Sequence, residues 1–263
     1  MEPQVSKTLG DVCVLGFGQT ALSVCTYLMA QGSSRVHSVA LFGGAQTHEG
    51  EKSAEFEALG VRVVTGTDEV CGTYSLCIAS PGVPDTSALF LSAAAHSQEI
   101  IGEPEFAFRE SPEKWIAITG TNGKTTTTTL VTKILQTAGQ KAISVGNIGR
   151  TITDELSSRT PDEWFVAELS SFQLATIACL HPKTAALLNI TPDHLEWHGT
   201  LAAYAAAKER IFENFDVHDL AVVSDLDEYC CACAQRLEAR HIRVCHLNTE
   251  DPKTEHAAFI RDG

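Results

Sequence analysis

The sequence predicts two consecutive α/β domains, each built on a parallel sheet. Short apolar runs typical of strands alternate with helix-like stretches along the whole chain, as in parallel α/β folds. Each half opens with a strand that leads directly into a glycine-rich turn, at residues 16–21 and 120–125. The length of 263 residues also fits two domains, since a domain takes ~100–200 residues. We therefore expect a Rossmann-like N-terminal domain followed by a P-loop-type parallel α/β central domain.

The elements follow in this order. In the first half we expect strands at residues 12–15, 36–42, 61–65 and 75–79, and helices at residues 20–31 and 53–59. The polar segment 109–114 reads as a linker and predicts domains at residues 1–111 and 112–263. The second half predicts strands at residues 115–119, 142–145, 164–169, 184–190, 221–224 and 242–246, with helices at residues 201–215 and 227–240.

Charge and composition exclude several classes of protein. The chain has 19 Lys and Arg against 33 Asp and Glu, a net charge of −14, which argues against bulk binding to nucleic acid or anionic membranes. No apolar run reaches the ~20 residues of a bilayer span, and no basic-then-apolar leader is visible. Nine cysteines without a regular framework favour reduced thiols. We expect a cytoplasmic protein without nucleic-acid partners or membrane insertion.

The first glycine turn has the pattern Gly16-x-Gly18-x-x-Ala21 between a strand and a helix. Such a turn lets backbone amides reach a phosphate at a helix N-terminus. An NAD site also needs an acidic residue after the second strand, where this chain has Phe42-Gly43-Gly44. The turn thus favours a phosphate-bearing ligand other than NAD, and the alternative is a turn that only packs the helix on the strand. A second loop, Ser80-Pro81-Gly82, follows a strand at the same sheet edge.

The second glycine turn is Gly120-Thr121-Asn122-Gly123-Lys124-Thr125-Thr126, which we call the phosphate loop. Its pattern is more specific for phosphate binding than that of the first turn. Backbone amides of such a loop cradle phosphate oxygens, Lys124 supplies a charge for the outer phosphates, and the Thr125 hydroxyl is suited to ligate Mg²⁺. Ile118 replaces the usual first glycine, so the loop is a variant. A chance turn is the alternative, against which the preceding strand and following helix argue.

Polar residues follow the next strands of the second half. Asn147, Glu168 and His194 each come after an apolar run, and the carboxyl ends of parallel strands share one edge of a sheet. Each residue alone would more often be structural or solvated. Their joint placement with the phosphate loop predicts a single site.

Lys208 lies on the apolar stripe of the helix expected at residues 201–215. The other members of that stripe are Leu201, Tyr204, Ile211, Phe212 and Phe215. A lysine that snorkels past apolar neighbours and a lysine with a functional role remain equal alternatives at this point.

Two weaker patterns involve metal-ligand residue types. Cys230 and Cys233 form a C-x-x-C, but on a helix without a second pair we expect buried thiols rather than zinc ligands. His198 follows His194 by four residues, yet Gly199 comes next and the segment reads as a loop. We therefore expect one functional histidine, His194.

Five motifs together resemble the Mur ligase family. They are GTNGKT at 120–125, GNIG at 146–149, ELSSFQ at 168–173, NITPDH at 189–194 and YAAAK at 204–208. The third is similar to the D-glutamate-adding branch, whereas sister Mur ligases and folylpolyglutamate synthetase share the phosphate loop but usually differ there. The resemblance covers nearly the whole chain.

The resemblance implies an ATP-dependent amide-forming ligase of peptidoglycan precursor synthesis. The family transfers the γ-phosphate of ATP to the carboxylate of UDP-N-acetylmuramoyl-L-alanine, and D-glutamate then attacks the acyl phosphate. It implies that Gly120, Thr121, Asn122, Gly123, Lys124, Thr125 and Thr126 hold ATP. Lys124, Glu168, His194 and Lys208 would be the catalytic residues.

The same resemblance implies two Mg²⁺ ions and a modified lysine. Thr125 and Glu168 would ligate one ion, and His194 would help to hold the second. Lys208 matches the lysine that the family carbamylates with CO₂, which supports metal binding. Burial of that lysine fits, because CO₂ reacts only with a neutral amine. Substrate contacts would come from Gly16, Gly18, Thr20, Ser80, Pro81 and Gly82 at the uridine end, and from Asn147, Ser170 and Gln173 at the muramoyl end.

Family members carry a third, C-terminal domain, and this chain ends at Arg261-Asp262-Gly263 inside the second. We therefore expect the chain alone to bind the UDP-substrate without ligating D-glutamate, as a monomer in a bacterial cytoplasm. The alternatives are a non-catalytic UDP-sugar-binding fragment or paralogue, another ligase of the Mur or folylpolyglutamate synthetase type, and a P-loop kinase or GTPase.

Overall fold

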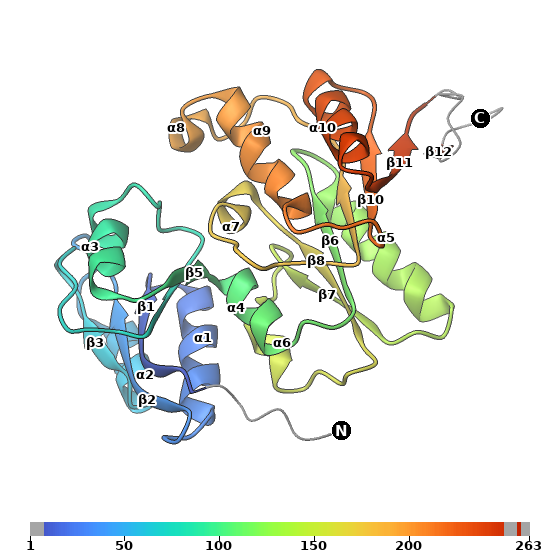
Figure 1. Cartoon of the computed structure of the whole chain (residues 1–263). Coiled ribbons are helices and arrows are strands. Elements are labelled where there is room, and N and C mark those ends of the chain that lie inside the picture. Colours follow the sequence, from blue (N-terminus) through green and yellow to red (C-terminus); the bar gives the residue numbers. More distant parts are fainter. Residues whose placement is uncertain (1–7, 250–256, 259–263) are drawn as a thin grey trace. The chain divides into compact units, whose positions relative to one another are not determined.

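The computed structural model describes residues 8–249 and 257–258 (Figure 1). The chain divides into two compact units, residues 1–107 with 153–157 and residues 108–152 with 158–263. The boundary expected between residues 111 and 112 stays a prediction. The chain end at residues 261–263 lies outside the described residues. In the described part, no helix has both the length and the apolar character that a membrane span requires.

The first unit contains one parallel sheet with the strand order β3-β2-β1-β4-β5. Its strands are β1 (Gly10–Leu15), β2 (Val36–Phe42), β3 (Arg62–Val64), β4 (Leu76–Ala79) and β5 (Ile100–Gly102). Its helices are α1 (Gln19–Ala30), α2 (Glu51–Ala58) and α3 (Ala88–His96), and α4 (Glu103–Glu110) leads out of the unit. This is the order of a Rossmann-like sheet, as predicted.

Both faces of this sheet are covered, which explains the continuous apolar runs. Val12 and Val14 of β1 pack with α1 and α2 in one core cluster. Cys13 and Leu15 point to the other face and pack with α3. Successive strand residues alternate between faces, so a strand buried on both sides has no polar position.

The second unit contains a parallel sheet with the order β12-β11-β10-β9-β6-β8-β7. Its strands are β6 (Trp115–Thr119), β7 (Ala142–Gly146), β8 (Trp164–Glu168), β9 (Thr184–Leu187), β10 (Leu220–Ser224), β11 (Arg243–Leu247) and β12 (Ala257–Ala258). Its helices are α5 (Lys124–Thr137), α7 (Ser171–Leu174), α8 (Leu195–His198), α9 (Leu201–Glu209) and α10 (Glu228–Ala239). Helix α6 (Ile152–Leu156) falls almost entirely in the first unit.

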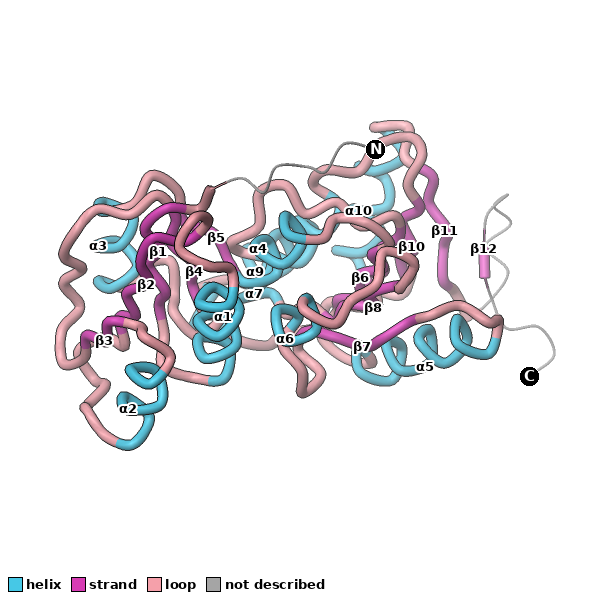
Figure 2. The backbone as a smooth tube through the Cα atoms, turned by 90° about the horizontal axis from the view of Figure 1, so that it is seen from below, coloured by secondary structure: helices cyan, strands magenta, loops and turns pink. Residues whose placement is uncertain are grey.

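The strand order places the carboxyl end of β6 where the connections change direction. From β6 the chain crosses to the edge strand β7, returns through β8, and then passes to β9 on the other side of β6. Helix α5 packs along β7 and β8 (Figure 2). Ligands of open α/β sheets bind at such a switch point, so the fold places the phosphate loop in the expected position.

Several elements differ from the sequence-based expectations. Helices α3 and α4 and strand β5 were not predicted, because residues 88–96 are apolar without a helical period and β5 has three residues. The helix expected at residues 201–215 ends at Glu209 and continues as the 3₁₀ turn Arg210–Phe212. The loop expected around His198 was wrong, because residues 195–198 form α8 after His194 adopts a left-handed conformation.

Candidate active site

The phosphate loop joins β6 to α5 and depends on close backbone approach. Gly120 has φ of +149°, and a Cβ there would lie 3.0 Å from the Cβ of Leu188 and 3.3 Å from the Asn189 nitrogen. Gly123 is the N-cap of α5 at φ of +82°. The first amides of α5 have no intrahelical acceptor, and no acidic residue lies in its first turn. The loop can therefore offer backbone donors to an anion.

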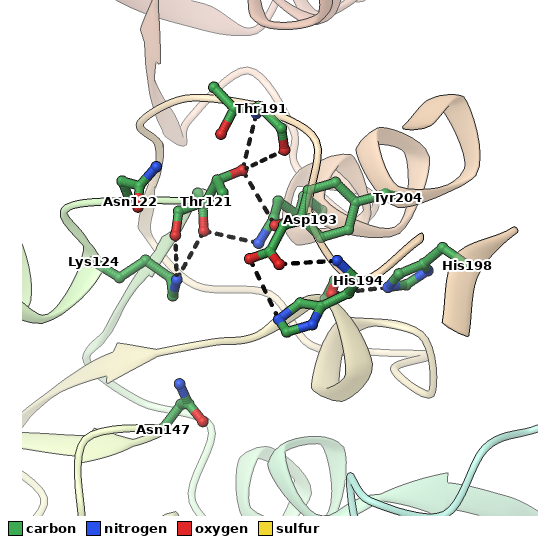
Figure 3. Close-up of polar contacts among 12 residues, drawn as sticks. Thr121, Asn122, Lys124, Asn147, Thr191, Asp193, His194, His198 and Tyr204 are labelled. Atoms are coloured by element: carbon green, nitrogen blue, oxygen red, sulfur yellow. Dashed lines mark hydrogen bonds and ion pairs between the residues drawn. The ribbon is translucent and has the colours of Figure 1, made fainter. Parts of the chain in front are cut away.

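Lys124 folds back onto this loop. Its Nζ donates to the carbonyl oxygens of Gly120 at 3.0 Å and Thr121 at 2.9 Å (Figure 3). The lysine is therefore held against the loop by two neutral carbonyl acceptors. A phosphate group can replace them with stronger hydrogen bonds between charged partners.

Glu168 at the end of β8 is the buried carboxylate of the site. It is 1% exposed and accepts hydrogen bonds from Thr125 Oγ1 at 2.8 Å and Asn147 Nδ2 at 3.0 Å. Gly146 permits this approach, since a Cβ there would lie 2.4 Å from the Glu168 carbonyl oxygen. The structure thus brings together three of the residues predicted from different strands.

The donor set of Thr125 and Glu168 fits a magnesium ion. Mg²⁺ prefers carboxylate and hydroxyl oxygens and is usually bound by one or two carboxylates together with substrate phosphates. Thr125 is the second residue of α5, so both oxygens lie beside the anion site. These two residues could hold such an ion.

Lys208 points into the same site from α9. It is 2% exposed, so its position on the apolar stripe reflects true burial. Its Nζ donates to the Gly120 carbonyl oxygen at 2.8 Å and lies 4.7 Å from the centre of the Tyr204 ring. Burial, together with the charge of Lys124, lowers the pKa of Lys208 from 10.5 to about 7. A substantial fraction of this amine is therefore neutral at physiological pH.

His194 lies on the loop before α8 with φ of +51°. Its Nε2 is 3.5 Å from Asp193 Oδ2 (Figure 3). Its ring centre is 4.9 Å from that of Phe172. The His198 ring stacks on Phe172, with 5.6 Å between the ring centres, and its Nε2 is 2.9 Å from Ser171 Oγ. His194 contacts neither Thr125 nor Glu168 among the described residues, so its metal role stays a prediction.

Ser170 and Gln173 form the cap of the short helix α7. The Gln173 amide donates to Ser170 Oγ at 3.2 Å, and Gln173 Oε1 accepts from the Ser170 amide at 2.9 Å. Such a capping box satisfies the free donors of a helix start. The predicted substrate contacts of both residues therefore compete with a structural role, and they stay predictions.

In the first unit the two predicted loops touch each other. Gly16 has φ of +107°, and a Cβ there would lie 2.7 Å from Ser80 Oγ. Gly18 is the N-cap of α1 without a side-chain hydrogen bond, and no acidic residue lies in the first turn of that helix. Ser80 Oγ is buried and has no hydrogen-bond partner within the described residues. This edge therefore offers unpaired donors that suit a phosphate or sugar oxygen.

A second group of ligand-type side chains lies near the amino ends of β9 and β10. The ligand atoms of His181, Asp216 and Asp219 all lie within 4.8 Å of one another. However, His181 Nε2 is 2.5 Å from Asp219 Oδ2, and Lys183 Nζ is 3.6 Å from Asp219 Oδ1. Burial raises the pKa of Asp219, but the Asp216 amide and His181 outweigh it and the net pKa is lowered. We interpret this group as the hydrogen-bonded surroundings of the buried Asp219 carboxylate.

The two cysteines of the C-x-x-C in α10, Cys230 and Cys233, are buried, as the sequence predicts. Burial raises the pKa of the Cys230 thiol, and it raises that of Cys233 to about 12. Neither belongs to a group of metal-ligand side chains in the described residues.

Sequence reasoning missed the residues that hold the loop in place. Asn189 and Thr191 follow β9 and hydrogen-bond the backbone or side chains of residues 121 and 122. Tyr204 was expected only as an apolar stripe residue, yet its hydroxyl lies 3.2 Å from Thr121 Oγ1. The only available signal was that Asn189 and Thr191 belong to the motif at 189–194 and Tyr204 to the motif at 204–208.

Comparison with known proteins agrees with this geometry. A profile of the Mur ligase middle domain matches residues 118–262. The chain belongs to the Mur ligase family. A relative from Koribacter versatilis named UDP-N-acetylmuramoylalanine–D-glutamate ligase is 38% identical over 256 residues, which cover 95% of this chain and 54% of the relative. One of the same name from Frankia casuarinae is 42% identical over 203 residues, covering 76% and 42%.

A solved structure shows the same fold. The UDP-N-acetylmuramate:L-alanyl-gamma-D-glutamyl-meso-diaminopimelate ligase from Neisseria meningitides has a TM-score of 0.56 at 14% identity. The match covers 90% of this chain and 77% of that one. The predicted fold, a pair of parallel α/β sheets, is therefore confirmed as that of a Mur ligase. The chain spans about half the length of the curated relatives it matches.

Proposed function

We propose that the protein is part of an ATP-dependent ligase that adds D-glutamate to UDP-N-acetylmuramoyl-L-alanine during peptidoglycan precursor synthesis. The observation that carries this is the single rim where Lys124, the Thr125–Glu168 pair and buried Lys208 surround one phosphate loop. The D-glutamate specificity is carried over from the names of relatives that are 38% and 42% identical.

The reaction has two steps. A carboxylate oxygen of the L-alanyl group attacks the γ-phosphorus of ATP, forming an acyl phosphate and releasing ADP. The amine of D-glutamate then attacks the acyl carbon, phosphate leaves, and the amine proton is lost to give an amide. Residues 120–126 hold the phosphates through backbone amides, and Lys124 neutralises the charge that develops on the transferred group.

Thr125 and Glu168 hold Mg²⁺ in this proposal, and His194 helps to hold a second ion. Bound Mg²⁺ neutralises phosphate charge and orients the phosphoryl group for transfer. The neutral amine of Lys208 attacks CO₂ and loses a proton to become a carbamate, whose oxygens add to the metal site. Its lowered pKa supports this, because the neutral form is the nucleophile.

In the proposal, each unit has a separate set of substrate-binding residues. The Gly16–Gly18 turn, Thr20 and the loop Ser80–Gly82 bind the UDP end, which is supported by the unpaired Ser80 hydroxyl. Asn147, Ser170 and Gln173 bind the muramoyl end. We further propose that the protein acts as a monomer in a bacterial cytoplasm.

Isothermal titration of the 263-residue chain tests the assignment. We expect UDP-N-acetylmuramoyl-L-alanine and MgATP to bind, and NAD not to bind. Binding of the UDP-substrate without any nucleotide binding would favour a non-catalytic UDP-sugar-binding protein, and nucleotide binding alone would favour a kinase-like protein. Whether these 263 residues ligate D-glutamate by themselves stays a prediction, expected negative, which D-glutamate-dependent phosphate release would contradict.

A further inference from the structure

The phosphate loop is bonded to the chain segment that leaves β9. The β6–β9 ladder continues past both strands, since the Leu188 amide donates to the Thr119 carbonyl at 3.0 Å and the Thr121 amide donates to the Asn189 carbonyl at 2.9 Å. The loop and residues 188–189 therefore run side by side with their backbones in contact. Gly120 is required at this point because any Cβ would meet Leu188.

The side chain of Asn189 extends this ladder by one more rung. Its Oδ1 accepts from the Asn122 amide at 2.8 Å, and its Nδ2 donates to the Asn122 carbonyl at 3.0 Å. A carboxamide offers one acceptor and two donors, so here it pairs with both backbone groups of Asn122 as a neighbouring peptide would. Asn122 itself is exposed, so these bonds are not a by-product of burial.

The same segment holds the residue before Asn122. Thr121 Oγ1 accepts from the Thr191 amide at 3.0 Å, donates to the Thr191 carbonyl at 3.2 Å, and lies 3.2 Å from the Tyr204 hydroxyl (Figure 3). A hydroxyl with one proton and two lone pairs satisfies all three contacts when Tyr204 donates. The loop is thus fixed on its outer side by residues 189–191.

We propose that Asn189 is a positioning residue that holds the phosphate loop in its anion-binding conformation. Gly123, the next residue, adopts a left-handed conformation at the start of α5. Fixing the Asn122 peptide therefore fixes the direction in which the backbone enters Gly123 and the helix. A loop that is already ordered binds phosphate without first losing its conformational freedom. The inference rests on the proposed nucleotide function of this loop and extends it to a residue that touches no ligand.

The experiment compares Asn189→Ala and Asn189→Asp with a matched control, Asn214→Ala. The Asn214 side chain also bonds two backbone groups, donating to the carbonyls of Ala178 and Leu180 at 3.0 Å each. The binding of MgATP and of magnesium tripolyphosphate is measured by titration, together with Tm. Tripolyphosphate consists only of phosphates, so a change in its affinity reports on the loop itself.

We expect Asn189→Ala to lower the affinity for both MgATP and magnesium tripolyphosphate about tenfold or more, because two hydrogen bonds to the loop are lost. Asn189→Asp should lower these affinities at least as much, since a carboxylate cannot donate to the Asn122 carbonyl and repels the anion. Asn214→Ala should lower Tm without changing either affinity. Unchanged affinities in Asn189→Ala beside normal binding by the unaltered chain would overturn the role and leave the proposed ligase intact.

Amide hydrogen exchange distinguishes a failure of the proposed nucleotide function from a failure of the positioning role of Asn189. If the unaltered chain binds neither ligand, the proposed function fails, and exchange at the Asn122 amide then decides the positioning role. Faster exchange at Asn122 in Asn189→Ala, with no change in Asn214→Ala, supports the role. Equal exchange in both variants overturns it.

Discussion

Replacing Lys208 by methionine should stabilise the second unit, by an amount that depends on pH. The folded state lowers the pKa of Lys208 from 10.5 to about 7. Between these values the unfolded chain binds a proton that the folded chain has lost, so the stability of the unaltered chain rises with pH across this window. The slope is ~1.4 kcal/mol per pH unit, and it disappears in Lys208→Met.

The structure sets the magnitude. At pH 9 folding must remove the lysine proton at a cost of ~2 kcal/mol, and at pH 7.5 the cost is ~4 kcal/mol. Methionine has no such cost, but it loses the hydrogen bond to the Gly120 carbonyl, worth ~1 kcal/mol at any pH. The advantage of Lys208→Met over the unaltered chain should therefore grow from ~1 to ~3 kcal/mol between pH 9 and 7.5.

Tryptophan fluorescence during urea unfolding provides the assay. Trp115, Trp164 and Trp197 are the protein's three tryptophans, and all belong to the second unit. Buffers should be free of CO₂ so that the amine is not modified. Lys133→Met, at an exposed position of α5, is the control and should follow the pH dependence of the unaltered chain. Parallel curves for Lys208→Met and the unaltered chain would refute the reasoning.

Three further perturbations test other parts of the site and fold. Glu168→Gln keeps the shape of the side chain but removes its negative charge, so the affinity for MgATP should fall about tenfold or more. The affinity for ATP without Mg²⁺ should change little, and equal losses of affinity with and without Mg²⁺ would contradict a metal role. Gly16→Ala should destabilise the first unit by ~1–3 kcal/mol in thermal unfolding because of its positive φ and the Ser80 contact, whereas Gly18→Ala, with no atom within 4 Å of the added Cβ, should not. Burial lowers the pKa of His246, but hydrogen bonds to Asp225 and Glu238 outweigh it and raise the pKa. The stabilising effect of protonated His246 should thus be present below pH ~6.5 and be lost as the pH rises through the raised pKa of the folded state. The Tm of the unaltered chain should then fall relative to the Tm of His246→Gln. A Tm difference that stays constant with pH would exclude this pairing.

Features that depend on local pattern were predictable from the sequence. The apolar run 12–15 predicts a strand covered on both faces, because a parallel sheet leaves no polar position. The turn at 120–125 is predictable as the link between a strand and a helix, because its glycines, lysine and threonine can act on one phosphate group only in that context. Lys208 was placed on an apolar stripe by helical spacing alone, and it is buried there.

Features that depend on register between distant segments were not predictable. The pairing of Asn189 with Asn122 joins positions 67 residues apart, and it follows from the alignment of β6 with β9. His194 has φ of +51°, a conformation that only a few per cent of non-glycine residues adopt, so no propensity indicated that α8 would begin there. The domain boundary and the ligand contacts of Ser170, Gln173 and His194 stay predictions for the same reason, since each depends on a partner outside the local segment.

The Gly120 carbonyl oxygen accepts hydrogen bonds from both Lys124 and Lys208, so the two amines compete for one acceptor with two lone pairs. A polyphosphate that draws Lys124 away would relieve this competition and place negative charge beside Lys208. Both effects raise the pKa of Lys208, so we expect nucleotide binding near neutral pH to take up a fraction of a proton, visible as a binding heat that varies with the ionisation enthalpy of the buffer. In the proposed ligase, the neutral and reactive form of this lysine then belongs to the nucleotide-free loop, which predicts that Lys208 reacts with CO₂ before ATP binds.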